Sequence, residues 1–211
     1  MDTVTASRAR LVAALEAGRL APAALADPIG IRIIAAATLA PAPRDPVEHL
    51  RTAHATARPL LERLTALDPA AEIVSTMTTT LFARLTRGPG DPPPSAASGR
   101  PYTYTPRKVL RRVLDHALDH LNQIDQWLAW QRDGVVPTPT HGWTPSTVTL
   151  AEDRLLLGAD DLRSWLWRID QAERLLAQRA AMLGEAELDW QPPDGGWPLR
   201  RVLHHVARSE V

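Results

Sequence analysis

A chain of 211 residues, of which 45% are hydrophobic and 23% charged, is long enough to form one domain with a buried core. Its 24 Lys and Arg residues balance its 24 Asp and Glu residues, so it lacks the positive charge of a general nucleic-acid binder. The absence of cysteine excludes disulfide bonds, thiolate metal ligands and a cysteine nucleophile.

The sequence contains no pattern typical of a membrane protein or of a secreted protein. Its longest nearly apolar run, residues 31–43, includes Arg32 and is shorter than the ~20 residues that a membrane-spanning helix needs. No basic stretch followed by an apolar segment, the pattern of a signal peptide, stands at the N-terminus. We therefore expect a cytoplasmic protein with neither a membrane nor a nucleic acid as partner.

The first 44 residues carry mixed signals. Residues 8–18 fit a short helix that stops at Gly18, whereas the alternation in residues 29–33 is closer to that of a strand. We expect residues 1–44 to form a small extension or subdomain and residues 45–211 to form the main domain.

Helical signals dominate from residue 45 onward. Asp45, Pro46 and Glu48 form a helix start, and apolar residues follow at helical spacing as far as Leu67. Pro59 is expected to kink or divide this helix. Residues 72–87 are predicted to form a second helix, although their β-branched residues weaken the pattern.

Three further helices follow. Thr105 and Pro106 predict the start of a helix that runs to about residue 132. Another is predicted from about residue 160 to a stop at Gly184, and the last begins at residues 197–198. Linkers rich in Pro, Gly and Thr separate these helices. The predicted fold is therefore all-α, a four-helix bundle with a small N-terminal extension.

The histidines are the candidate metal ligands of this chain. His49 and His54 are five residues apart, about 140° around a helix, so we expect both at the surface or at its boundary. His116 and His120 instead stand four apart on one otherwise apolar helical face, with β-carbons roughly 6 Å apart. Two imidazoles so placed can bind one ion through nitrogen.

A short internal sequence repeat indicates a third histidine. Residues 199–205 are identical to residues 110–116 at six of seven positions, which makes His205 the equivalent of His116. Helical periodicity places His205 on the apolar face and His204 on the face of Arg201. Three inward histidines from two helices form a site with open coordination positions, as a catalytic metal needs. Arg111, Arg112, Arg200 and Arg201 are expected to face solvent.

Two segments resemble the DinB-like superfamily of metal-binding four-helix bundles, which includes thiol-dependent S-transferases and maleylpyruvate isomerases. Residues 116–124, His-Ala-Leu-Asp-His-Leu-Asn-Gln-Ile, are similar to the family's His-x-x-x-His-x-x-Gln-Ile helix. Residues 194–205 resemble its Gly-x-Trp-Ser helix start, with a metal-binding histidine eight residues after the tryptophan. The resemblance covers roughly residues 45–211.

The resemblance implies that His116, His120 and His205 hold a divalent metal ion, with Zn or Ni favoured over Fe or Mn. It also implies a metal-dependent transferase or isomerase that acts on a small molecule with a low-molecular-weight thiol, and a homodimer. Because the chain lacks cysteine, the thiol would come from a cosubstrate. The tryptophan motif precedes the His-x-x-x-His motif in the family but follows it here, which indicates a permuted or swapped helix order.

Two alternatives stand beside a metal-dependent enzyme. The first is a non-catalytic stress or scaffold protein in which the ion clamps two helices together. The second is a bundle with buried histidines and no metal. The chain has no phosphate-binding loop, no Gly-x-Ser-x-Gly elbow and no His-Glu-x-x-His motif, which argues against nucleotide-dependent and serine-hydrolase chemistry.

Overall fold

The first described helix begins at the cap that the sequence predicts. The structure, a computed structural model, describes residues 43–66, 73–75, 102–138, 144 and 148–208. Helix α3 (Pro46–Glu62) starts where the Asp45 carboxylate accepts a hydrogen bond from the Val47 amide at 2.8 Å. The helix continues through Pro59, so this proline does not divide it, and the 3-10 helix η2 (Arg63–Ala66) follows directly.

The longest helix is α5 (Pro106–Asp133), with Pro106 at its first position. Its N-cap is Thr105, whose hydroxyl oxygen accepts a hydrogen bond from the Lys108 amide at 3.1 Å. Gly134 ends the helix with φ of 69°, a left-handed conformation that glycine adopts without steric cost. Both ends therefore agree closely with the prediction.

Replacing Thr105 with alanine is expected to lower the free energy of unfolding by about 1–2 kcal/mol. The Thr105 hydroxyl group both caps α5 and donates a hydrogen bond to the backbone carbonyl of Asp153. Urea unfolding of Thr105→Ala measures this cost, with Thr105→Ser as the control that keeps the hydroxyl group. Equal losses in the two variants would contradict the capping role.

The predicted helix at residues 72–87 is wrong where the structure describes it. Strand β1 (Ile73–Ser75) pairs antiparallel with strand β2 (Tyr102–Tyr104) to form a two-stranded sheet. Ile73 and Val74 are β-branched and favour an extended backbone, and β2 supplies the backbone partners that an isolated strand would lack. Residues 76–87 lie outside the described residues, as do residues 1–42 of the predicted extension.

The second half of the chain supplies two more helices of the bundle. After the short 3-10 helix η3 (Glu152–Arg154), helix α6 (Ala159–Ala180) ends four residues before the predicted stop. Gly184 instead precedes the short helix α7 (Glu185–Leu188). Helix α8 (Leu199–Arg208) then starts just after Trp197 and Pro198, as predicted.

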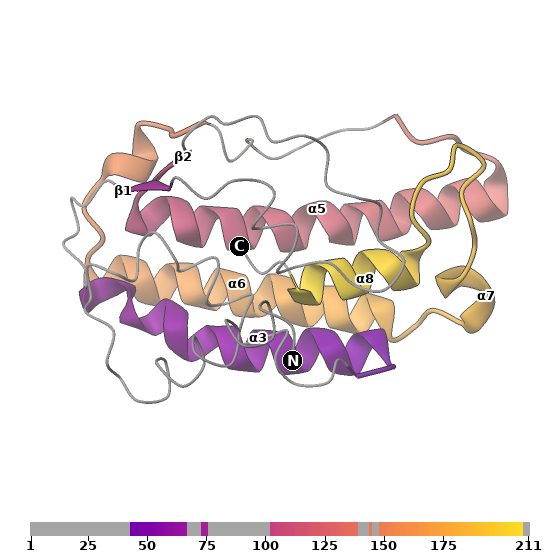
Figure 1. The fold of residues 1–211 in the computed structure, drawn as a ribbon, viewed down its shortest axis with the longest axis horizontal. Coiled ribbons are helices and arrows are strands. Elements are labelled where there is room, and N and C mark those ends of the chain that lie inside the picture. Colours follow the sequence, from indigo (N-terminus) through magenta and orange to yellow (C-terminus); the bar gives the residue numbers. More distant parts are fainter. Residues whose placement is uncertain (1–42, 67–72, 76–101, 139–143, 145–147, 209–211) are drawn as a thin grey trace, which may run out of the picture.

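Four of the described helices pack around a common core (Figure 1). Helix α3 packs against α6 and α8, and α5 packs against the same two helices, so the four form a closed ring. The seam between α5 and α8 therefore lies opposite the groove between α3 and α6. The predicted all-α fold class is confirmed, with the small β1–β2 sheet as an addition.

The core consists of two adjoining clusters of buried apolar side chains. One includes Leu50, Ile124, Leu176 and Leu203, and the other includes Leu61, Leu110 and Ile169, all at most 1% exposed. The partly buried Leu114 packs against both clusters. Burying a side chain of this size contributes about 1.5–3 kcal/mol. The helices are thus held at fixed positions, as a site shared by two of them requires.

The expectation that Arg111 and Arg112 face solvent is wrong. Arg111 is 9% and Arg112 5% exposed, and described residues of the connection between α5 and α6 contact both side chains. Arg111 donates to both carboxylate oxygens of Asp153 at 2.8 and 2.9 Å, and Arg112 donates to the Thr144 carbonyl at 3.1 Å. The helical pattern could not show that polar groups of a later segment would meet these two arginines.

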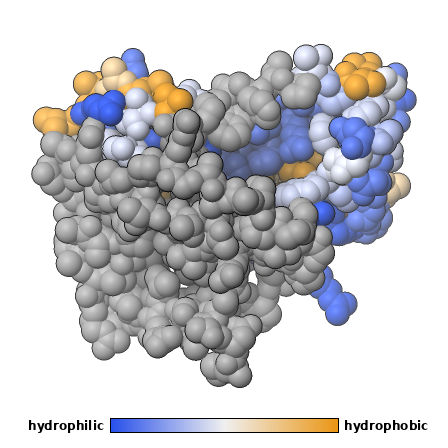
Figure 2. All heavy atoms as spheres, turned by 45° about the horizontal axis from the view of Figure 1, so that its top comes forward, coloured by the Kyte–Doolittle hydropathy of each residue, from blue (hydrophilic) through white to orange (hydrophobic). Residues whose placement is uncertain are grey.

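The described residues form a largely polar surface on the face that Figure 2 shows. In Figure 2 hydrophilic residues dominate the described part of the face brought forward there, and hydrophobic residues form separate small patches. No helix within the described ranges combines the length and apolar composition needed to cross a bilayer.

Candidate metal centre

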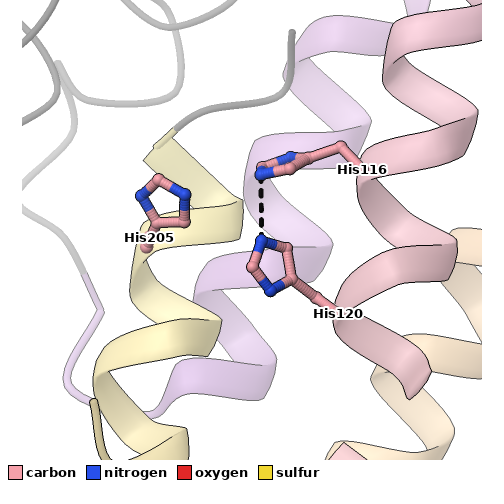
Figure 3. Close-up of side chains that lie close together, drawn as sticks. All are labelled: His116, His120 and His205. Atoms are coloured by element: carbon pink, nitrogen blue, oxygen red, sulfur yellow. Dashed lines mark hydrogen bonds between the residues drawn. The ribbon is translucent and has the colours of Figure 1, made fainter. Parts of the chain in front are cut away.

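The three histidines singled out from the sequence lie together in the structure. His116 and His120 project from successive turns of α5, and His205 projects towards them from α8 (Figure 3). One ring nitrogen of each lies within 4.8 Å of those of the other two. Two segments that are far apart in sequence therefore bring three potential nitrogen ligands to one point.

The spacing of these nitrogens suits a shared ion. The Nε2 atoms of His116 and His120 are 3.1 Å apart. Two nitrogens bonded to one ion at ~2.0–2.1 Å, at tetrahedral to octahedral angles, stand about 2.8–3.4 Å apart. The His205 ring centre lies 5.4 Å from that of His116 and 5.5 Å from that of His120, so it completes a nearly symmetric triangle.

Gln123 fixes which nitrogen of His120 faces the centre. Its side-chain Oε1, which can only accept a hydrogen bond, lies 2.7 Å from His120 Nδ1. His120 therefore donates through Nδ1, and its Nε2 keeps a lone pair directed towards His116. Metal-binding histidines commonly donate a hydrogen bond from the N–H group of their second ring nitrogen to such an acceptor.

Burial favours the neutral form of both histidines on α5. It holds the pKa of His116 well below the usual range, and the neighbouring His120, His205 and Arg112 lower this pKa further. Burial also lowers the pKa of His120, against the opposing effect of its hydrogen bond to Gln123. Neutral imidazoles have a free lone pair for a cation at neutral pH.

The turn before α8 positions His205. Gly195 adopts φ of 82°, and the Trp127 indole nitrogen donates to the Trp197 carbonyl at 2.9 Å, which ties this turn to α5. The Trp197 ring packs edge-on against His205 with ring centres 5.3 Å apart, and the Arg201 guanidinium group lies over the Trp197 ring, 4.2 Å from its centre. These contacts anchor Trp197 at the start of α8, beside His205.

Of the remaining histidines, His49 and His204 differ from expectation, whereas His54 lies at the boundary of the protein as expected. His49 is buried rather than at the boundary, and its Nδ1 lies 2.8 Å from Nδ1 of His204. His204 therefore faces α3 rather than solvent, because α8 packs against α3 on that side. His54 is partly buried, and its Nε2 lies 3.0 Å from the Asp170 carboxylate on α6. His141 lies outside the described residues.

Sequence reasoning missed the role of Gln123 and the burial of Arg112. Gln123 is three residues after His120, a spacing at which helical side chains meet, so its contact could have been predicted. Arg112 is one helical turn before His116, and its burial depends on Thr144, which helical periodicity does not report. Both residues shape the environment of the triad without belonging to it.

Comparison with known proteins matches the C-terminal part of the chain. The DinB superfamily matches residues 168–211, which include α8 and His205. A protein of Bacillus licheniformis, named as a candidate metal-dependent hydrolase, is 41% identical over 51 residues, which are 24% of this chain and 29% of that protein. The chain thus spans less than a third of that relative, and no solved structure matches it significantly.

The family match and the histidine pair come from different parts of the chain. Residues 168–211 include His205, whereas His116 and His120 lie outside the match. Only the fold brings these two histidines close to His205. Both motif helices lie in one chain and pack together, so no exchange of helices between protomers is needed to bring them together. The match, the relative and the helical fold support assignment of this chain to the DinB-like superfamily.

Proposed function

We propose that His116, His120 and His205 bind one divalent metal ion and that the protein is a metal-dependent enzyme acting on a small molecule. The observation that carries this proposal is the convergence of three ring nitrogens within 4.8 Å of one another. Zn or Ni fits an all-imidazole ligand set best, and Fe or Mn is the alternative.

The protein groups fit such an ion. His116 is buried and neutral, Gln123 orients His120, and Trp197 limits the movement of the His205 ring. Three imidazoles leave coordination positions open, which distinguishes a catalytic site from a closed structural one. A divalent ion there supplies Lewis acidity, which lowers the pKa of a ligand that binds to it.

The reaction proposed from the sequence is group transfer or isomerisation with a low-molecular-weight thiol as cosubstrate. The Bacillus relative named as a metal-dependent hydrolase supports a second reaction type, in which water takes the place of the thiol. Both need the same site, because each relies on the ion to activate a weak nucleophile. The absence of cysteine means that the chain itself offers no thiol.

Product analysis separates the two reactions. The metal-loaded protein is incubated with activated esters, epoxides and unsaturated acids, each with and without a small thiol, and products are identified by mass spectrometry. Turnover that requires thiol supports transfer or isomerisation, and turnover in water alone supports hydrolysis. Turnover retained by His120→Ala would contradict a metal mechanism, and bound metal without turnover would favour the non-catalytic alternative.

Replacing Gln123 with alanine is expected to weaken metal binding by about 10–100-fold, the usual cost of losing a hydrogen-bond partner of a metal ligand. Without the Oε1 acceptor, His120 can place its proton on Nε2, the atom that faces His116. Competition with a fluorescent chelator measures the change, and Gln123→Glu, which keeps the acceptor, is the control. An unchanged affinity in Gln123→Ala would show that Gln123 does not orient the ligand.

A further inference from the structure

A cavity lies in the groove between α3 and α6, opposite the α5–α8 seam that carries the histidine triad. Its volume is about 290 Å³, near the lower end of the range for small-molecule sites. Side chains from residues 50–55 of α3 and 170–178 of α6 form its walls, including Leu50, Ala177 and Glu173. The cavity is therefore separate from the proposed metal centre.

The unusual feature of this cavity is the buried carboxyl group of Glu173. Glu173 is 5% exposed, and its Oε2 atom has no hydrogen-bond partner among the described residues. Leaving a buried polar group without a hydrogen-bond partner carries a cost in free energy. A ligand that completes the hydrogen bonding of Glu173 would remove this cost.

The charges around the cavity favour an anion. Arg51 of α3 and Arg174 of α6 line it, one from each wall, and both are exposed. The Asp170 carboxylate is already engaged by His54 at 3.0 Å and by Arg58 at 2.9 Å. Asp125 of α5 pairs with Arg179 of α6, and neither residue lines the cavity.

Glu173 complements these arginines when it is neutral. Burial, with a smaller contribution from Asp170, raises the pKa of Glu173 to about 8, so its carboxyl group keeps a proton at neutral pH. A protonated carboxyl group donates a hydrogen bond. Two guanidinium groups and one such donor match a carboxylate, whereas an ammonium group would meet two positive charges and a donor.

We propose that the α3–α6 groove binds a small monocarboxylate, which contacts Arg51 and Arg174 at the rim and accepts a hydrogen bond from Glu173. The apolar part of the ligand packs against Leu50 and Ala177. The limited volume of the cavity restricts the ligand to an acid of a few carbon atoms.

Butyrate and butylammonium test the charge preference, because they have the same length and opposite charge. Isothermal titration of the full chain at pH 7 should show butyrate binding and at least tenfold weaker butylammonium binding. Arg51→Ala combined with Arg174→Ala should weaken butyrate binding at least tenfold. No binding of butyrate at 20-fold molar excess over millimolar protein (roughly tens of millimolar), or preferential binding of butylammonium, would overturn the proposal.

Glu173→Gln separates the hydrogen bond from the charge. The glutamine side chain has the same size and keeps a donor, so butyrate binding at pH 7 should stay within about threefold of wild type. In wild type the affinity should fall about tenfold per pH unit above pH 8, because binding then requires uptake of a proton, whereas Glu173→Gln should show no such fall. The same pH dependence in both proteins would exclude Glu173 as the donor.

Discussion

Replacing His205 with alanine is expected to weaken divalent-metal binding more than about 100-fold, since losing an outer hydrogen-bond partner alone costs about 10–100-fold. His205 is the only member of the triad on α8, so its loss leaves the two nitrogens of α5 without the third ligand. Metal analysis after dialysis should find about one ion per wild-type chain, as one three-ligand site holds. His205→Ala should retain almost none.

His204→Ala is the matched control for this change. His204 is the neighbouring residue on α8, but its Nδ1 lies 2.8 Å from His49 of α3, and it does not belong to the cluster of three histidines. The control should keep its metal, and metal should raise the melting temperature of His204→Ala but not that of His205→Ala. Full metal occupancy in His205→Ala would remove His205 from the proposed site.

Replacing Asp153 with alanine is expected to lower the free energy of unfolding by about 3–5 kcal/mol, the usual cost of removing one partner of a buried ion pair. The Asp153 and Arg111 side chains are 3% and 11% exposed, and they share two hydrogen bonds. Without Asp153, the Arg111 guanidinium group remains buried with carbonyl partners and Asp115 alone.

Urea unfolding measures this loss, and Arg163→Ala provides the comparison. Arg163 pairs with Asp160 on the exposed face of α6, where an ion pair contributes between 0 and about 1 kcal/mol. Asp153→Asn keeps the shape of the side chain and tests the contribution of its charge. If Asp153→Ala and Arg163→Ala lower the free energy of unfolding by the same amount, the Asp153–Arg111 ion pair does not stabilise the fold.

The sequence predicts most of the helical framework because local signals determine it. Asp45 and Thr105 mark helix starts through short-range capping contacts, and Gly134 marks a helix end. The β1 strand was missed because its stability depends on pairing with residues about 30 positions away, which a local pattern does not contain. The burial of Arg111 was missed for the same reason, since Asp153 belongs to a later segment.

The positions of the three histidines could be predicted for different reasons. The pair on α5 follows from a spacing of four residues, which any helix satisfies. The prediction for His205 depends on the sequence repeat between residues 110–116 and 199–205, and the structure places its ring beside the other two. The Glu173 cavity left no such signal, because a single glutamate on a helix is usually at the surface.

Anomalous X-ray diffraction from crystals of the metal-loaded protein tests the central proposal most directly. We expect one strong anomalous peak per chain, about 2.0–2.1 Å from a ring nitrogen of each of His116, His120 and His205. A peak bound elsewhere, or none between these three rings after metal loading, would contradict the proposed metal centre.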